Sequence, residues 1–502
     1  MIRNVGSNWI LILVTIAFTY VTTPFVIHRI GVDGYGTWAL ITALTGYLGL
    51  LVLGVPMASV RYFAQHVAEG DQASLNKAIG SCTALYLVLG GAALLVGTGL
   101  FGFFTRTYDV PVALRSDARL AFGLMVLYVS AGFVATLPGG VLNAHDAFVL
   151  RNKVGLASLL LRLGLTMGLL TFKAWLVFLP IILMACLAFD FSVSWFVIRR
   201  RYPGVRMRLA DFDWAAVRRI FSFSLYVLIL TAGGRLSFET DSLVIGKFQT
   251  VGSIPYFTVA NSFIIYLMEF ILGISQVMLP TAARLRTQGR TEELREVFLK
   301  WSKIALSLTL MAGLFLIVLG PRFIAWWIDP SFEGPAGAVL QILMVSYLVF
   351  LPVRGVALPI LMGLGKAGVP TIGFLITGLV NLGLSILLVG KLGLAGVALG
   401  TAIPNVFFAF LVLSVACREL KISVMHYARY VIPRAALGAF PVLALLLWFK
   451  VGLDVRSLAG LAGSGVAMMA LFAVTWVFFV YRNDPYLDLR VQLGRLRAWS
   501  RA

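Results

Sequence analysis

The chain has 502 residues, of which 60% are hydrophobic and only 12% are charged, and its formal net charge is +20. Apolar runs of about 20 residues recur along its whole length, which is typical of an all-α polytopic membrane protein. This pattern excludes a water-soluble fold, and it excludes a membrane β-barrel because the runs are continuous and do not alternate.

The apolar runs predict about fourteen transmembrane helices. Only Phe172, Lys173 and Ala174 separate the fifth and sixth spans, so these two form a tight hairpin. The predicted spans cover residues 8–28, 35–57, 80–104, 118–142, 153–172, 175–198, 220–246, 256–281, 301–320, 337–363, 370–390, 394–417, 430–449 and 457–481.

Basic residues are distributed unevenly over the predicted loops. If the N-terminus is cytoplasmic, most Lys and Arg residues outside the spans fall on the inner side. This asymmetry predicts a multi-pass membrane protein with both termini in the cytoplasm. It also indicates that most of the positive charge faces anionic membrane lipids, so the charge is no evidence of nucleic-acid binding.

The chain aligns weakly with itself at an offset of 219 residues. The matched positions are Val32, Tyr47, Leu48, Gly54, Gly70 and Leu75 with Val251, Tyr266, Leu267, Gly273, Gly289 and Leu294. The same offset sets Thr22 on Asp241, His28 on Lys247 and Arg162 on Asn381. Because it covers an even number of spans, it predicts a parallel repeat: two six-helix bundles around a central cavity, with two additional C-terminal helices.

The repeat suggests five regions. Residues 1–198 form the N-terminal bundle, 199–219 a basic cytoplasmic linker and 220–417 the C-terminal bundle. Residues 418–481 add two transmembrane helices, and 482–502 form a basic amphipathic cytoplasmic tail.

The segment from Thr231 to Lys247, TAGGRLSFETDSLVIGK, places charged residues inside the predicted seventh span. A charge near the bilayer centre costs at least about 2.5–3.5 kcal/mol, so it needs a partner or a water-filled cavity. Arg235 and Glu239 are four residues apart and share a helix face, whereas Asp241 lies on another face. The segment is therefore either a self-neutralising pair that fixes helix packing or the polar wall of a transport cavity.

Other charges also fall within predicted spans. Arg162 is too deep in the fifth span to reach the interface easily, and Arg354 lies between two prolines that kink the tenth span. Together with Arg235 these arginines could form a cationic lumen suited to phosphate or acidic sugars, or each could be paired structurally. Lys247 and Asn381 complete the candidate substrate-binding set.

Four acids are candidate proton or sodium sites: Glu269, Asp241, Glu239 and Asp190. Glu269 has only apolar neighbours in the sequence YLMEFILG, so we expect it to be the acid that gains and loses a proton. Asp241 is the next candidate.

No catalytic or nucleotide-binding motif is present. Residues 362–368, MGLGKAG, contain a Gly-Lys pair but lack the upstream glycine and the Ser or Thr of a phosphate-binding loop. The three cysteines have no metal-ligand spacing. We therefore expect no cofactor, no metal and no enzymatic activity, with transport driven by an ion gradient or by the substrate's own gradient.

Three stretches resemble the bacterial polysaccharide and O-antigen-unit flippases of the MATE-like (MOP) superfamily. The first contains a Gly-x-x-x-Tyr-Gly turn and a second helix that ends in Gly and then Arg, at Gly31, Tyr35, Gly36, Gly54 and Arg61. The others are ETDSLVIGKFQTVGSIPYF and GLGKAG followed by NLGLSILLVGKLGLAGVALG. Val52 departs from the family pattern, because many members carry Asp two residues before the helix-two glycine.

This resemblance implies two six-helix bundles that move an undecaprenyl-diphosphate-linked oligosaccharide outward by alternating access. Membrane lipids are implied partners, and a polysaccharide polymerase and glycosyltransferases are possible ones. Alternatives are a lipid II flippase, a multidrug or cation antiporter, and a membrane glycan polymerase or ligase. An antiporter predicts an acid-rich lumen with few arginines, which this sequence does not have. A polymerase or ligase needs a long external loop, and none is evident in the sequence.

Overall fold

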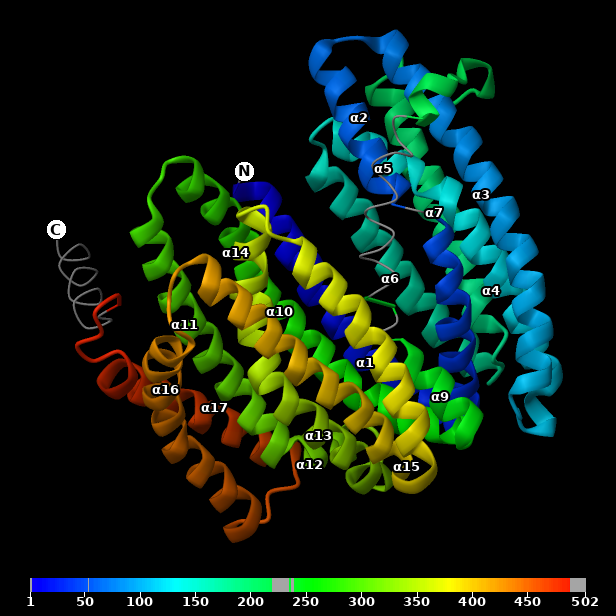
Figure 1. The fold of residues 1–502 in the computed structure, drawn as a ribbon. Coiled ribbons are helices and arrows are strands. Elements are labelled where there is room, and N and C mark those ends of the chain that lie inside the picture. Colours follow the sequence, from blue (N-terminus) through cyan, green and yellow to red (C-terminus); the bar gives the residue numbers. More distant parts are fainter. Residues whose placement is uncertain (1, 53, 219–233, 236–238, 488–502) are drawn as a thin grey trace. The chain divides into compact units, whose positions relative to one another are not determined.

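The computed structural model describes residues 2–52, 54–218, 234–235 and 239–487, and this part of the chain is built from helices without a β-strand (Figure 1). Eleven helical segments in it are long and apolar enough to cross a membrane. The prediction of an all-α polytopic membrane protein is thereby confirmed.

The α-helices run in the following order, with short 3-10 or π-helical turns between some of them. They are α1 (Ile2–Gly46), α2 (Val55–Glu69), α3 (Gln72–Thr107), α4 (Arg115–Ala135), α5 (Leu137–Ala144), α6 (Phe148–Phe172), α7 (Phe178–Arg201), α9 (Thr240–Phe248), α10 (Ile254–Thr287), α11 (Thr291–Val318), α12 (Gly320–Trp327), α13 (Glu333–Pro352), α14 (Leu358–Gly363), α15 (Gly368–Glu419), α16 (Val424–Leu447) and α17 (Leu458–Thr475).

Two of these helices each contain two predicted spans. The backbone of α1 leaves the helical region at Gly31 (φ 78°, ψ 167°), and that of α15 leaves it at Gly393 (φ 56°, ψ −135°). Positive φ values of this kind favour glycine, so the two residues mark the breaks between consecutive spans. The predicted seventh span lies largely outside the described residues, and the total of fourteen stays a prediction.

The second predicted span ends differently from the expectation. The 3-10 segment η1 (Tyr47–Val52) follows α1, and Gly54 then adopts φ 73° as the N-cap of α2. Pro56 stands in the first turn of α2, where its missing N–H is tolerated. The apolar run therefore stops at Gly54, and the segment with Arg61 forms a separate helix.

The described chain divides into two compact units. The first comprises residues 1–235 and 242–255, and the second comprises residues 236–241 and 256–502. In the first unit α3 packs against α4, and α1 packs against α4 and α6. In the second unit α11 packs against α13 and α16, and α13 packs against α15 (Figure 1). The five predicted regions stay predictions.

Within the first unit, two segments that the 219-residue offset relates lie against each other. A Cβ on Gly36 would be 1.9 Å from the Val251 carbonyl oxygen, and a Cβ on Gly252 would be 2.2 Å from Asp33 Oδ1. The backbones of Gly36 and Val251 can approach this closely because position 36 is glycine, whereas at Gly252 the neighbour is the Asp33 side chain. Gly36 of the family-like motif thus has a packing role.

In the second unit a buried ion pair joins α11 to the segment after α17. Lys303 Nζ lies 2.5 Å from Asp484 Oδ2, both side chains are at most 1% exposed, and Tyr430 donates a hydrogen bond to Asp484 Oδ1 (2.8 Å). Burial alone would raise the pKa of Asp484, but the hydrogen bonds from Lys303 and Tyr430 outweigh it and hold that pKa below its ordinary value. The contact fixes the C-terminal helices to α11.

Candidate functional site

A buried carboxylate of the second unit is the centre of the candidate site. Asp241, in the first turn of α9, is 3% exposed. Thr401 Oγ1 on α15 lies 3.1 Å from each carboxylate oxygen of Asp241. Asn381 Nδ2, on the earlier half of α15, donates to Thr401 Oγ1 at 2.9 Å. The three side chains form one buried polar group, which we call the Asp241 cluster.

The backbone turn at Gly393 brings the two halves of α15 together. A Cβ on Gly400 would lie 2.3 Å from Ser385 Oγ, and one on Gly396 would lie 2.4 Å from the Leu388 carbonyl oxygen. Glycines at these positions allow the two halves to touch. Residues twenty positions apart, Asn381 and Thr401, therefore face each other.

The Asp241 cluster is rich in oxygen atoms. Besides the carboxylate it offers the hydroxyl of Thr401 and the side-chain oxygen of Asn381. The Val397 carbonyl oxygen lies 3.4 Å from both Thr401 Oγ1 and Ser385 Oγ. Carboxylate, hydroxyl and carbonyl oxygens suit a hard cation, and one carboxylate balances one positive charge. No group of three or more His, Cys, Asp or Glu side chains in the described residues has metal-site geometry.

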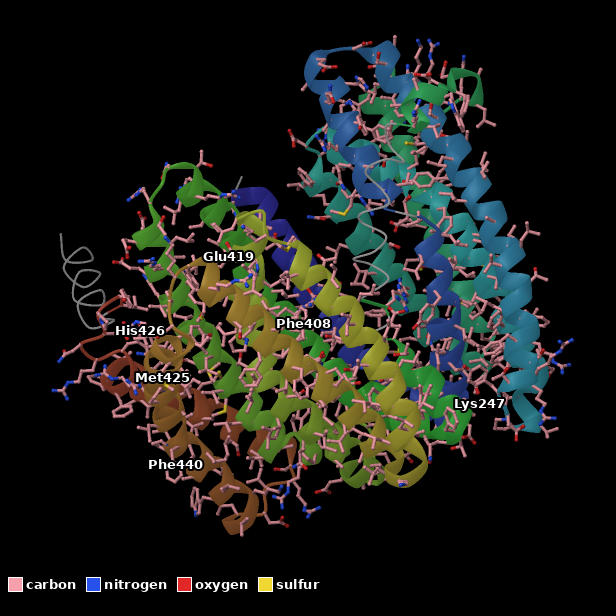
Figure 2. All side chains as sticks on the ribbon, viewed as in Figure 1. Lys247, Phe408, Glu419, Met425, His426 and Phe440 are labelled. Atoms are coloured by element: carbon pink, nitrogen blue, oxygen red, sulfur yellow. The ribbon has the colours of Figure 1, made fainter. Side chains whose placement is uncertain are left out.

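Further polar residues connect this cluster with Arg354. Tyr347 is 1% exposed, lies near Asn405, and is within electrostatic reach of both Asp241 and Arg354. The Arg354 guanidinium lies 5.2 Å from the ring centroid of Phe374, whose ring is 5.3 Å from that of Phe408. Phe408 is labelled in Figure 2.

Arg354 belongs to a π-helical turn, Val353–Ala357, that follows Pro352. It lines a cavity of about 320 Å³ in the second unit, together with Ser275 and Gln276. The predicted kink between the two prolines thus places a guanidinium at a cavity.

The first unit contains a pocket of about 190 Å³ that holds Arg162. The guanidinium lies 5.2 Å from the Phe18 ring centroid. The lining also contains several threonines, and its described part has no Asp or Glu: it comprises Thr15, Phe18, Thr19, Thr22, Thr23, Val26, Tyr35, Trp38, Leu159, Arg162, Thr166, Leu179 and Ile182. An arginine in such a pocket suits an anionic or hydroxyl-rich ligand.

The Arg162 pocket and the Asp241 cluster use the same positions of the repeat. Subtracting 219 from Asp241, Asn381 and Thr401 gives Thr22, Arg162 and Ile182, and all three line the Arg162 pocket. The same subtraction relates the neighbouring pair Tyr347 and Asn405 to Tyr128 and Cys186. These two also lie within electrostatic reach of each other. Equivalent positions therefore converge in each unit.

The other predicted residues lie elsewhere. The Arg235 side chain lies near Gly49, since a Cβ there would be 3.5 Å from Arg235 Nη2. Glu239 belongs to the second unit and Arg235 to the first, so the expected pair between them stays a prediction. Lys247 is exposed at the end of α9 and donates to the Thr107 carbonyl oxygen at 3.3 Å (Figure 2).

Two acids have surroundings that differ from those of Asp241. Glu269 is exposed and lies within electrostatic reach of Arg354, so the protein does not bury it as its apolar neighbours in sequence suggest. Asp190 is half-buried in the first unit, near Ser158 and within electrostatic reach of Arg151. Of the four predicted acids, Asp241 is the one that is buried within a set of neutral oxygen ligands.

Sequence reasoning missed Thr401, Tyr347 and Asn405. For Tyr347 a signal was available, because the 219-residue offset aligns it with an identical residue, Tyr128. In the structure Tyr128 lies within electrostatic reach of Arg162, and Tyr347 within reach of Asp241. Thr401 lacked such a signal because its counterpart, Ile182, is apolar.

Comparison with known proteins decides the family. Residues 1–286, more than half of the chain, match the family described as polysaccharide biosynthesis protein. The chain belongs to this family. This chain resembles the uncharacterized membrane protein EpsK of Bacillus subtilis (strain 168). The two are 23% identical over 412 residues, which cover 80% of this chain and 79% of EpsK.

Solved structures show the fold of this polysaccharide biosynthesis protein. An inward-facing multidrug resistance MATE family transporter of the MOP superfamily aligns with a TM-score of 0.67 and 15% identity, over 80% of this chain and 94% of that one. The lipid II flippase MurJ, in an inward closed conformation, aligns with a TM-score of 0.61 and 15% identity, over 92% and 98%. The fold is MATE-like, and the resemblance found in the sequence is confirmed.

Proposed function

We propose that this polysaccharide biosynthesis protein is a flippase that translocates a lipid-linked oligosaccharide, carried on undecaprenyl diphosphate, across the bacterial cytoplasmic membrane. Membership of the family supports a role in surface polysaccharide biosynthesis, and the MATE-like fold supports transport by alternating access. The observation that carries the proposal is the pair of equivalent polar sites: a carboxylate cluster in one unit and an arginine pocket in the other.

The Asp241 cluster is the coupling site in this proposal. A buried carboxylate with neutral oxygen ligands is stabilised when it takes up a monovalent cation, either Na⁺ or a proton, because the cation removes an uncompensated buried charge. The cluster joins Asp241 to both halves of α15, so cation uptake favours one arrangement of these three side chains. Asn381, predicted as a substrate residue, belongs to the coupling cluster, and Asp241 takes the place that the sequence suggested for Glu269.

The arginines are the substrate residues. Arg162, Arg235 and Arg354 provide planar donors that match phosphate oxygens, and Lys247 adds a charge near the end of α9. These side chains bind the diphosphate and the glycan while the isoprenoid tail stays in the bilayer. No side chain is assigned a catalytic role.

A lipid II flippase is the second candidate, because the fold resembles that of MurJ and the substrate would carry the same diphosphate-linked tail. The arginines argue against a multidrug or cation antiporter, since a cationic substrate would be repelled. A glycan polymerase or ligase lacks support from the transporter-like fold.

A cell assay separates the two leading candidates. In a strain that makes lipid-linked repeat units but lacks its own polysaccharide flippase, expression of this chain should restore surface polymer. Arg354→Ala should insert in the membrane at wild-type levels and fail to restore it. Rescue of cells depleted of their lipid II flippase, without restored polymer, would favour the second candidate. Neither rescue, at normal membrane levels, would contradict both.

A further inference from the structure

A strap of residues 202–218 follows α7 and lies along α3 in the first unit. Asn76 holds it from both sides: its Nδ2 donates to the Gly204 carbonyl oxygen and its Oδ1 accepts from the Arg206 N–H, both at 2.9 Å. Ser81 Oγ accepts from the Asp213 N–H at 2.8 Å and donates to the Asp213 carbonyl oxygen at 3.1 Å. The strap therefore has a fixed position on α3.

Close backbone packing supports the same position. A Cβ on Gly80 would lie 2.6 Å from the Arg208 carbonyl oxygen, so glycine allows the strap to touch α3. The strap buries Val205, which is 3% exposed and belongs to the core of this unit. The ring of Tyr202 lies 4.0 Å from that of His145. This segment is thus a folded part of the first unit.

The outer side of the strap combines large apolar side chains with arginines. Trp214 is 70% exposed, and Phe212 and Leu209 are also exposed. Arg208 and Arg218 are exposed on the same short segment. Aromatic rings and arginines together are typical of residues at a membrane interface.

Between the strap and α3 lies an apolar hollow of about 710 Å³. The described lining comprises Ala84, Leu85 and Val88 of α3 with Phe212, Trp214, Val217 and Arg218 of the strap. Every one of these side chains is apolar except Arg218. The α3 residues lie in the predicted third span, so the hollow reaches from the interface into the hydrocarbon layer.

We propose that this hollow binds one anionic phospholipid, with an acyl chain against Val88 and Trp214 and the phosphate on Arg218. An apolar hollow at this depth excludes water, and an acyl chain is the filling that the bilayer supplies. Arg208 adds positive charge near the headgroup, and each arginine near an anionic membrane surface strengthens binding about fivefold.

The acidic residues of the strap do not cancel this attraction. Asp213 accepts a hydrogen bond from the Ala215 N–H through Oδ1 (3.0 Å), which engages its carboxylate within the strap. Asp211 is half-buried. The exposed charges of the strap, Arg206, Arg208 and Arg218, are basic. This lipid site is independent of the transported substrate and of the Asp241 cluster.

Brominated lipids test the site directly, because bromine on an acyl chain quenches a tryptophan that it touches. The purified full-length protein is reconstituted in phosphatidylcholine vesicles that contain brominated phosphatidylglycerol or, separately, brominated phosphatidylcholine. The difference between the wild type and Trp214→Phe isolates the signal of Trp214. We expect phosphatidylglycerol to quench this signal at least about fivefold more effectively than phosphatidylcholine.

Matched variants separate the acyl chain from the headgroup. Val88→Phe, which fills the hollow, should abolish the preferential quenching, whereas Leu95→Phe, at an exposed position two turns away on the same helix, should preserve it. Arg218→Ala should lower the preference about fivefold, and Lys77→Ala, which removes a charge outside the hollow, should leave it unchanged.

Three results would overturn the proposal. Equal quenching by both lipids would mean that Trp214 contacts only the ordinary lipid that surrounds the protein. Unchanged preference in Val88→Phe would remove the hollow as the binding site. Displacement of phosphatidylglycerol by an equimolar amount of undecaprenyl phosphate would identify the carrier lipid of the substrate as the occupant.

Discussion

The Arg162 pocket and the Asp241 cluster contain positions that the 219-residue offset relates, and they carry opposite charges. In the first unit the positions hold Thr22, Arg162 and Ile182, and in the second they hold Asp241, Asn381 and Thr401. The side chains come from α1, α6 and α7 in the first unit, and from the start of α9 and the two halves of α15 in the second. The side chains at those positions then determine whether a unit attracts an anion or a cation.

In the proposed function this difference gives the two units separate tasks. The second unit offers oxygen ligands around one buried acid, which suits a coupling cation. The first unit offers a guanidinium in a threonine-lined pocket, which suits phosphate or sugar. A transporter that couples an anionic substrate to a cation needs both kinds of site, and in the proposed function each unit supplies one of them.

The largest effect is expected from Asp241→Asn. It removes the negative charge that balances the bound cation. A cation in the cluster would then be an uncompensated buried charge, which costs about 3–5 kcal/mol, so transport should fall at least about a hundredfold. The assay is restoration of surface polymer in a flippase-null strain, with membrane levels measured in parallel. Glu269→Gln is the matched control. If Glu269→Gln abolishes polymer and Asp241→Asn does not, the sequence-based assignment is correct and the Asp241 cluster is structural.

Arg162→Ala tests the other half of the comparison. Loss of a charge-assisted contact costs about 1.5–3 kcal/mol, so transport should fall about tenfold to a hundredfold while the affinity for the cation stays unchanged. Arg162→Lys should keep part of the activity, because an ammonium retains the charge but lacks the planar pair of donors. Transport of lipid-linked oligosaccharide into proteoliposomes at a fixed ion gradient measures this. A change in cation affinity alone would contradict the division of tasks.

Thr401→Val sharpens the assignment of the cation ligands. The substitution keeps the shape of the side chain and removes the hydroxyl that contacts Asp241 and Asn381. Loss of one such hydrogen-bonding group is worth about 0.5–1.5 kcal/mol, so we expect roughly two- to tenfold weaker cation affinity. Ile182→Val, at the equivalent position of the first unit, should have no effect on it. Equal effects of the two variants would show that the repeat positions are packing residues only.

The smallest effect is expected at the tyrosine pair. Tyr347→Phe removes the buried hydroxyl near Asn405, next to the Asp241 cluster, and should lower the stability of the protein by about 1 kcal/mol. Tyr128→Phe, at the half-buried equivalent position, should have a smaller effect. Thermal unfolding of the detergent-solubilised variants compares them. A larger loss for Tyr128→Phe would mean that the first unit depends more strongly on its polar contacts.

Much of the fold follows from local sequence. Long apolar runs predict helices directly, and thirteen of the fourteen predicted spans coincide with helices of the described residues. The break before α2 was missed because the apolar run continues to Met57, whereas the left-handed conformation of Gly54 ends the segment earlier.

The candidate site was predicted only in part. Asp241 was recognised because a charge inside an apolar run is conspicuous, but Thr401 is an ordinary residue until the turn at Gly393 brings it to Asp241. Glu269 was preferred for its apolar neighbours in sequence. Such neighbours point to different faces of a helix, and the face that carries Glu269 is exposed.

The most direct test of the central claim is ion flux driven by the substrate. Purified wild-type protein and Asp241→Asn are reconstituted in vesicles loaded with a sodium- or proton-sensitive dye, and a gradient of lipid-linked oligosaccharide is imposed. The wild type should move one of the two cations when substrate is present, and Asp241→Asn should move neither. Substrate-driven cation flux of equal size in Asp241→Asn and in the wild type would contradict the assignment of this cluster as the coupling site.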